Sequence, residues 1–201
     1  MIETAHRHLT SIILAAGQSS RMKTSKIILL WGEHSVIGNI ILAFQKAGIS
    51  EIVVVTGGYR EMVETEVKKY NIQPIYNPNF KNGEMAVSLQ TGMELLDQAC
   101  DGIFIALGDQ PEIDPSDLQE MIEQSRNSPE KLIIPSYNMR RGHPWLVPEK
   151  YFNEIKGLRP PETMRSFIQS HQDEIVYYVV KNSGILTDLD TPEDYQRLKP
   201  K

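Results

Sequence analysis

Residues 12–26 read IILAAGQSSRMKTSK, and this stretch decides how the rest of the chain is interpreted. Its apolar start at 12–14 has the composition of a buried parallel strand. The small residues at 15–17 follow, and they would let a ligand approach the backbone closely. Arg21 and Lys26 come next and could neutralise the charge of a phosphate ligand. The pattern favours a phosphate-binding loop at the end of a first strand.

The same stretch lacks the two common glycine-rich signatures. Gly17 stands alone, so neither G-x-G-x-x-G nor G-x-x-x-x-G-K-[ST] is present. Any α/β protein also needs a tight turn after its first strand, and a lone glycine can serve only that purpose. The missing signatures argue against a dinucleotide-dependent oxidoreductase and against a P-loop NTPase.

Composition limits the class of protein further. The chain has 201 residues, of which 40% are hydrophobic and 23% charged, so we expect one ordered domain over 1–201. A net charge of -5 argues against a nucleic-acid binder. Cys100 is the only cysteine, which excludes an internal disulfide and a cysteine-based zinc cluster and predicts a buried small residue.

The chain shows no targeting or membrane signal. Residues 1–10 carry Arg7 but no long apolar run, and no apolar run reaches membrane-spanning length. We therefore expect a cytoplasmic protein.

Predicted strands and helices alternate along the chain. We expect strands at 12–14, 51–56, 72–76, 102–107 and 132–134, and helices at 35–47, 59–70, 84–98 and 115–125. This order predicts an α/β fold, a three-layer sandwich around a mostly parallel sheet. Residues 137–161 are richer in proline and glycine, and we expect them to leave the sheet as a small substrate lobe.

Ligands of such sheets bind at the carboxyl ends of the strands. Asp109 follows the apolar strand 102–107 and could therefore bind Mg²⁺, which prefers carboxylate and phosphate oxygens. The alternative is an ordinary turn, because the sequence around it is Gly-Asp-Gln-Pro.

A second pair of acids precedes a helix near residue 192. Thr191, Pro192 and Asp194 predict a helix start with a capping box. Asp188 and Asp190 lie just before it, and Asp190 is the first candidate to join Asp109 at a metal, with Asp188 as the alternative.

Two further polar segments are candidates for substrate contacts. Residues 77–89 include Asn77, Gly83 and Ser88, whose uncharged groups suit the edge of a nucleobase, although part of the segment could only cap a helix. Residues 140–144 read RRGHP. There we assign Arg140 to a solvated turn, and Arg141 and His143 to contacts with an anionic substrate. No second histidine or cysteine has the spacing of a zinc site.

Four motifs together resemble one enzyme family. They are LAAGQSSRM at 14–22 followed by Lys26, GDQP at 108–111, RGHP at 141–144 and DLDTPED at 188–194. In this order they resemble the cytidylyltransferase branch of the molybdopterin nucleotidyltransferases, over residues 12–198. The guanylyl branch typically has Gly-Gly where this chain has Ala16-Gly17, so CTP is the expected donor. One departure is Lys23, which stands where the family usually has glycine.

The resemblance implies a Rossmann-like fold of the nucleotide-diphospho-sugar transferase type, Mg²⁺ dependence and transfer of a nucleotidyl group to the terminal phosphate of molybdopterin (molybdenum cofactor). The product could pass to a molybdenum hydroxylase. The resulting assignments are Arg21, Lys26 and Asp109 for catalysis; Leu14, Ala15, Ala16, Gly17, Arg21, Lys26, Asn77, Gly83 and Ser88 for the nucleotide; Arg141 and His143 for the acceptor; and Asp109 and Asp190 for the metal.

Three alternatives remain open at this point. One is a transferase that acts on a sugar phosphate or an isoprenoid phosphate. Another is a non-catalytic accessory protein that binds the cofactor for a molybdenum hydroxylase. The third is a dinucleotide-dependent oxidoreductase, against which the missing glycine signature argues.

Overall fold

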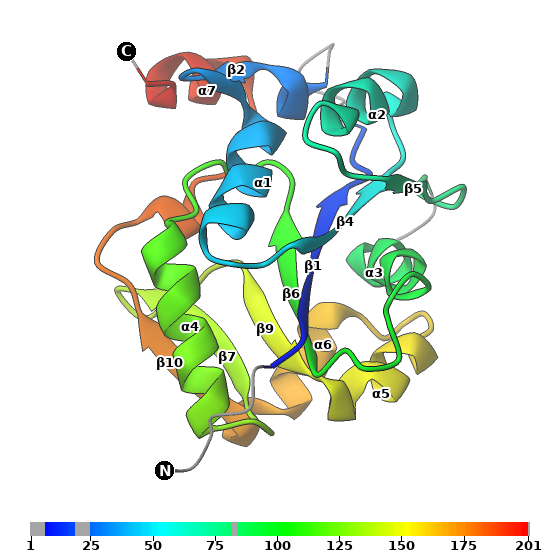
Figure 1. Cartoon of the computed structure of the whole chain (residues 1–201), viewed down its shortest axis with the longest axis vertical. Helices are drawn as coiled ribbons and strands as arrows, with labels where there is room; N and C mark the ends of the chain where they lie inside the picture. The colour runs from blue at the N-terminus through cyan, green and yellow to red at the C-terminus, as the bar shows by residue number, and fades with distance from the viewer. Residues whose placement is uncertain (1–6, 19–24, 82–83, 201) are drawn as a thin grey trace.

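The computed structural model describes residues 7–18, 25–81 and 84–200. Its centre is one sheet, in which seven strands follow the order β10-β7-β9-β6-β1-β4-β5 and β8 pairs with β7 (Figure 1). The strands are β1 (Leu9–Ala15), β4 (Glu51–Thr56), β5 (Pro74–Tyr76), β6 (Gly102–Leu107), β7 (Leu132–Tyr137), β8 (Arg140–Arg141), β9 (Trp145–Pro148) and β10 (Ile175–Val179). A separate hairpin consists of β2 (Leu30–Trp31) and β3 (His34–Ser35).

The sheet is mostly parallel, as the sequence predicts. β1 pairs in parallel with β4 and β6, β4 with β5, and β7 with β10. The loops that follow β1, β4, β5 and β6 therefore emerge at one edge of the sheet, where a ligand would bind.

The segment 137–161 differs from the expectation. β9 lies between β6 and β7 and is antiparallel to both, so residues 145–148 run within the sheet, and the expectation that they leave it is wrong. The sequence does not reveal this strand because it is short, follows Pro144 and ends at Pro148, and proline is usually excluded from central strands.

Helices cover both faces of the sheet. The α-helices are α1 (Val36–Lys46), α2 (Arg60–Lys68), α3 (Met85–Met93), α4 (Pro115–Asn127), α5 (Phe152–Gly157), α6 (Met164–Ser170) and α7 (Pro192–Leu198). The described residues also form the 3₁₀ turns η1 (Lys26–Ile28), η2 (Glu149–Tyr151), η3 (Gln172–Glu174) and η4 (Gly184–Leu186).

Successive side chains of each strand point to opposite faces, and each face has its own core. Ile13, Val54 and Phe104 pack with α1, α2 and α4, whereas Ile12 and Ile105 pack with α3, α5 and α6. The result is the three-layer sandwich expected from the sequence. Cys100 is buried at 2% exposure, also as expected.

A smaller third core lies beyond the edge of the sheet. Trp31 on β2, Val36 on α1 and Leu189 are buried together, with Tyr195 of α7 packed against them. The hydroxyl of Tyr195 donates to the carbonyl of Leu30 over 2.6 Å, so α7 is fixed to the hairpin. Thr191 and Asp194 form the predicted capping box. Among the described residues, no helix has the length and apolar character needed to cross a membrane.

Candidate active site

Three loops meet at the edge of the sheet with their backbones in contact. The amide of Gly108 donates to the carbonyl of Leu14 over 3.0 Å, and the amide of Gly58 donates to the carbonyl of Ala16 over 3.1 Å. A Cβ on Gly57 would lie 2.6 Å from the carbonyl oxygen of Ala16. Glycine is required here because the loop after β4 passes directly over the end of β1.

A cluster of charged side chains lies at this edge. The ammonium of Lys26 is 2.6 Å from Oδ2 of Asp109 and 3.1 Å from Oδ1 of Asp190. Lys26 begins η1, Asp109 follows β6, and Asp190 precedes α7, so three distant segments converge on one point. The side chain of Lys26 is only 14% exposed. Its burial lowers the pKa of Lys26, but the carboxylates of Asp109 and Asp190 outweigh that effect, so the net shift of the pKa is upward.

Asp188 is held differently from Asp190. Its Oδ1 accepts a hydrogen bond of 2.7 Å from Nε2 of Gln110. Desolvation raises the pKa of Asp188, and the hydrogen bond from Gln110 opposes that rise. Leu189 between the two acids is fully buried, and its amide donates to the carbonyl of Asp109 over 3.4 Å. The segment 188–190 is therefore docked on the loop that carries Asp109, and Asp190 is the acid that shares a cation with Asp109.

A hollow of about 180 Å³ lies beside this cluster. It is lined by Leu14, Ala15, Gly17, Lys26, Ile27, Leu107 and Asp109. A cation and the ends of two strands thus form its wall, which is an arrangement suited to phosphate groups.

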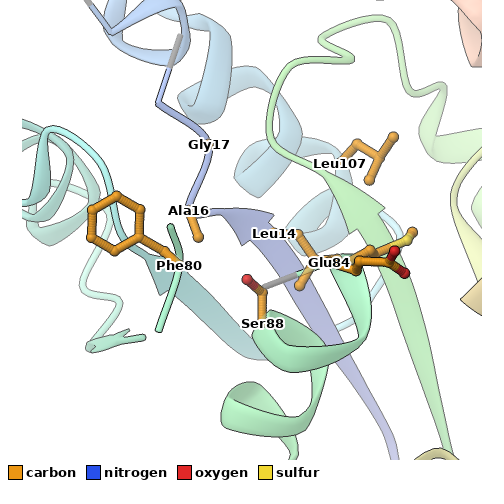
Figure 2. A pocket seen from close by; sticks show the side chains of 8 residues that line it. Leu14, Ala16, Gly17, Phe80, Glu84, Ser88 and Leu107 are labelled. Carbon is orange, nitrogen blue, oxygen red and sulfur yellow. The ribbon is translucent and has the colours of Figure 1, made fainter. Parts of the chain in front are cut away.

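A second hollow of about 210 Å³ adjoins the first, because both are lined by Leu14, Gly17 and Leu107. Its other lining residues are Ala16, Phe80, Glu84, Met85 and Ser88. Figure 2 shows Ser88 and Glu84 at the start of α3, close to Leu14 at the end of β1. The hollow combines apolar walls with few polar groups, as expected of a site for a flat ring.

Asn77 lies behind this hollow and is not among its lining residues. Its side chain is fully buried, donates to Oγ of Ser88 over 3.0 Å and accepts from the amide of Asn79 over 2.9 Å. The sequence predicts Asn77 next to a base, and in the structure its amide holds Ser88 in place. Ser88 lines the hollow, and a contact of either residue with a base stays a prediction.

The segment 140–144 reaches the same edge of the sheet. Trp145 pairs with Ile105 of β6, so His143 lies close to the end of that strand, and its amide donates to the carbonyl of Ile185 over 3.4 Å. The guanidinium of Arg141 is exposed and lies 5.4 Å from the ring centre of Tyr177.

His143 is not a cation at neutral pH. Its ring stacks on Trp145 with centroids 4.4 Å apart, and its Nε2 is buried without a hydrogen-bond partner among the described residues. Burial lowers the pKa of His143 to about 4. A contact with an anionic substrate would therefore come from an N–H of the neutral imidazole and not from a charge.

The residues at the edge fit a divalent cation bound together with phosphate. The described chain contains no group of three or more His, Cys, Asp or Glu side chains that could enclose a metal. Asp109 and Asp190 nevertheless direct carboxylate oxygens at one point. Mg²⁺ typically uses one or two carboxylates together with substrate phosphates. Oε1 of Gln110 is buried without a hydrogen-bond partner among the described residues and could accept from a metal-bound water.

Two residues of the predicted site, Arg21 and Gly83, lie outside the described residues, as does Lys23. Of the rest, Leu14, Ala15, Ala16, Gly17, Lys26, Ser88 and Asp109 line the two hollows.

The sequence analysis missed several residues at the edge. Gly57 and Gly58 follow a buried strand directly, and two consecutive glycines in that position could have indicated a close approach of two backbones. Phe80 lines the second hollow and packs near Tyr76, with ring centroids 6.3 Å apart. The bond between Gln110 and Asp188 has no local signal, since it joins segments that only the fold brings together.

Comparison with known proteins identifies a family that the chain resembles. Residues 11–175 match the sequence profile of the "MobA-like NTP transferase domain". The molybdenum cofactor cytidylyltransferase of Escherichia coli is 29% identical, with 92% of each chain covered. The purine catabolism protein PucB of Bacillus subtilis is 28% identical, with 96% of each chain covered.

A solved structure has the same fold. The crystal structure of Rv0371c from Mycobacterium tuberculosis superposes with a TM-score of 0.84 at 24% identity, covering 96% of this chain and 97% of that chain. A second structure of Rv0371c, in complex with manganese, gives a TM-score of 0.79 at 23% identity, covering 96% of this chain and 98% of that chain.

Proposed function

Because the chain belongs to the family of MobA-like NTP transferase domains and is a nucleotidyltransferase, we propose that it transfers CMP from CTP to the terminal phosphate of molybdopterin. The observation that carries this proposal is the convergence of Lys26, Asp109 and Asp190 beside two adjoining hollows. Lys26 in the wall of one hollow is a cation that a phosphate could bind, and we assign the base to the other hollow, whose walls are mostly apolar.

The proposed reaction is an in-line displacement. An oxygen of the acceptor phosphate forms a bond to the α-phosphorus of CTP, while the bond from that phosphorus to the bridging oxygen breaks and pyrophosphate leaves. A phosphate oxygen is already an adequate nucleophile, so no side chain has to act as a general base. Catalysis then depends on orientation and on stabilisation of charge.

Side chains of the protein would supply both the orientation of the substrates and the stabilisation of charge. Lys26, together with Arg21, would bind the β- and γ-phosphates and stabilise the leaving pyrophosphate. Asp109 and Asp190 would hold Mg²⁺, which neutralises developing charge on phosphate oxygens when it is bound. The contacts between the backbones of Leu14, Ala16, Gly58 and Gly108 fix the loops that carry these side chains.

The acceptor would approach from the side of β8 and β9. Arg141 is exposed there, and the neutral imidazole of His143 lies at the same edge of the sheet. We assign both to the acceptor because they belong to the segment that reaches the end of β6 from the side opposite to β1.

Three features bear on the choice of donor. The related Escherichia coli protein is named a cytidylyltransferase, which supports CTP. The methyl group of Ala16 lines the base hollow and would crowd a purine. Glu84 also lines that hollow, and an acid is a common partner of the N1 and N2 donors of guanine. Glu84 is therefore the residue that argues against the choice of CTP.

The proposal is tested by measuring pyrophosphate release. Purified protein is incubated with Mg²⁺ and CTP, GTP, ATP or UTP, with and without molybdenum cofactor, and the products of an equal mixture of CTP and GTP are analysed. We expect cofactor-dependent release with CTP and a cytosine dinucleotide as the main product.

Three other results would each contradict a different part of the proposed function. A pool dominated by the guanine dinucleotide would refute CTP as the donor. Release with a sugar phosphate or an isoprenoid phosphate instead of the cofactor would refute the acceptor. Tight cofactor binding without release from any triphosphate would indicate an accessory protein.

A further inference from the structure

Lys26 occupies the point where the two acids of the site converge. Its ammonium is 2.6 Å from Oδ2 of Asp109 and 3.1 Å from Oδ1 of Asp190, and its side chain is 14% exposed. Lys26 is 164 positions from Asp190 in sequence, and Asp109 lies between them in the chain. The lysine is therefore bound by the same carboxylates to which we assign the metal.

An ammonium and a divalent cation compete for the position between these two oxygens. Mg²⁺ binds carboxylate oxygens at about 2.0–2.1 Å and requires near-octahedral geometry. A nitrogen within 3.1 Å of both carboxylates would lie in or against that coordination sphere. Two cations in a partly desolvated place would also repel each other strongly. Either Lys26 or the metal can be held between Asp109 and Asp190.

We propose that Lys26 is the resident cation of the nucleotide-free site, and that the metal binds well only when a polyphosphate draws the ammonium away. This proposal rests on the function proposed above for its assignment of Asp109 and Asp190 to a metal and of Lys26 to phosphate. It does not depend on which base or acceptor the enzyme uses.

The displacement makes binding of metal and nucleotide cooperative. A triphosphate offers Lys26 new anionic partners, and the metal then compensates the carboxylates that the ammonium has left. By thermodynamic reciprocity each ligand raises the affinity for the other. When pyrophosphate leaves, Lys26 can return to the carboxylates and promote release of the metal.

The test measures Mn²⁺ binding to nucleotide-free protein from the signal of free Mn²⁺ in electron paramagnetic resonance. The variants are Lys26→Met and Lys26→Gln, which remove the charge, and Lys26→Arg, which keeps it. We expect Lys26→Met and Lys26→Gln to tighten Mn²⁺ binding roughly tenfold, the factor that corresponds to about 1.4 kcal/mol. We expect Lys26→Arg to leave the affinity close to that of the wild type.

Two controls separate this effect from a general change in charge. Lys131→Met removes a lysine that pairs with Glu174 over 2.8 Å away from the site, and Mn²⁺ binding should not change. Asp109→Asn combined with Lys26→Met should abolish the gain. Since the experiment contains no nucleotide, a wrong assignment of donor or acceptor would not alter it.

Unchanged or weaker Mn²⁺ binding in both neutral variants would overturn the proposal, and so would a gain that survives Asp109→Asn. If Lys26→Met does not fold, Lys26→Gln decides the question, because its amide can still donate to one of the carboxylates. Thermal unfolding gives a second readout, in which Mn²⁺ should raise the Tm of the neutral variants by more than that of the wild type.

Discussion

Gln110 donates a hydrogen bond of 2.7 Å to Asp188, and this bond separates the roles of the two acids in the segment 188–190. Asp188 is turned to a neutral amide, whereas Asp190 is turned to the ammonium that also contacts Asp109. The sequence left open which acid would join Asp109, and the structure favours Asp190.

Replacing these acids singly should therefore give different results. Asp109→Asn and Asp190→Asn each remove a charge from the shared point, and we expect kcat to fall by roughly 10²-fold or more, the scale of a lost electrostatic contact in a transition state. Asp188→Asn keeps an oxygen that can accept from Gln110, and we expect kcat to stay within a few-fold of the wild type. Steady-state pyrophosphate release measures all three, with circular dichroism to verify folding.

A large loss of kcat in Asp188→Asn, with Asp190→Asn nearly normal, would reverse the assignment of the second ligand.

Glu84 gives a direct test of donor selection. It is the acid that lines the base hollow, so Glu84→Gln removes a partner for guanine but retains the size of the side chain. For an enzyme that uses CTP, we expect kcat/KM for CTP to change by less than about threefold and any residual activity with GTP to fall. The measurement is a competition between the two triphosphates. A strong loss of activity with CTP in this variant would mean that Glu84 binds the cytosine.

His143 should make stability depend on pH. Its pKa is lowered to about 4 in the folded protein and lies near 6.5 when unfolded, so the unfolded state binds more protons between these values. The stabilisation is present above pH 6.5 and is lost as the pH falls towards 4. Between pH 7 and pH 5 we expect this residue to lower the free energy of unfolding by about 2 kcal/mol.

Urea unfolding of wild type and His143→Gln at the two pH values measures this contribution. The difference in free energy between the two proteins should shrink at pH 5. A wild-type pH dependence identical to that of His143→Gln would contradict the prediction.

Leu189 should be important for both stability and catalysis. It is fully buried against Trp31 and Val36, and its amide bonds to the loop of Asp109. We expect Leu189→Ala to lower the free energy of unfolding by about 2–4 kcal/mol and to lower kcat as Asp190 loses its position. Leu30 is next to Trp31 on β2 and is 65% exposed, so Leu30→Ala is the matched control. We expect it to change the free energy of unfolding by no more than about 0.5 kcal/mol. Normal kcat in Leu189→Ala would show that Asp190 is positioned without this anchor.

Local sequence patterns predicted the strands and helices whose hydrophobic residues form clear runs or repeats. The apolar strands β1, β4 and β6 and the helix after Asp114 are confirmed, because buried runs and caps are local signals. The strand β5 begins at Pro74 and α3 ends at Met93, so both are shorter than predicted. The antiparallel insertion of β9 could not be predicted, since its pairing with β6 depends on the tertiary fold.

In the candidate site, too, some features follow from the local sequence and others depend on the tertiary fold. Lys26, Asp109 and Asp190 were predicted because each follows or precedes an identifiable element, and the strand-end rule places such residues together. The burial of His143 and the commitment of Asn77 to Ser88 could not be predicted, because both depend on neighbours far away in sequence.

The distance of 164 positions between Lys26 and Asp190 also determines when the site can form as the protein folds. Contacts between such remote segments close long loops, and they form late relative to helices and neighbouring strands. During refolding, the helical signal should therefore recover before the protein regains its cation-binding centre. A chain stalled between these stages would have most of its secondary structure and no activity, so loss of activity in a folding variant does not by itself identify a residue of the active site.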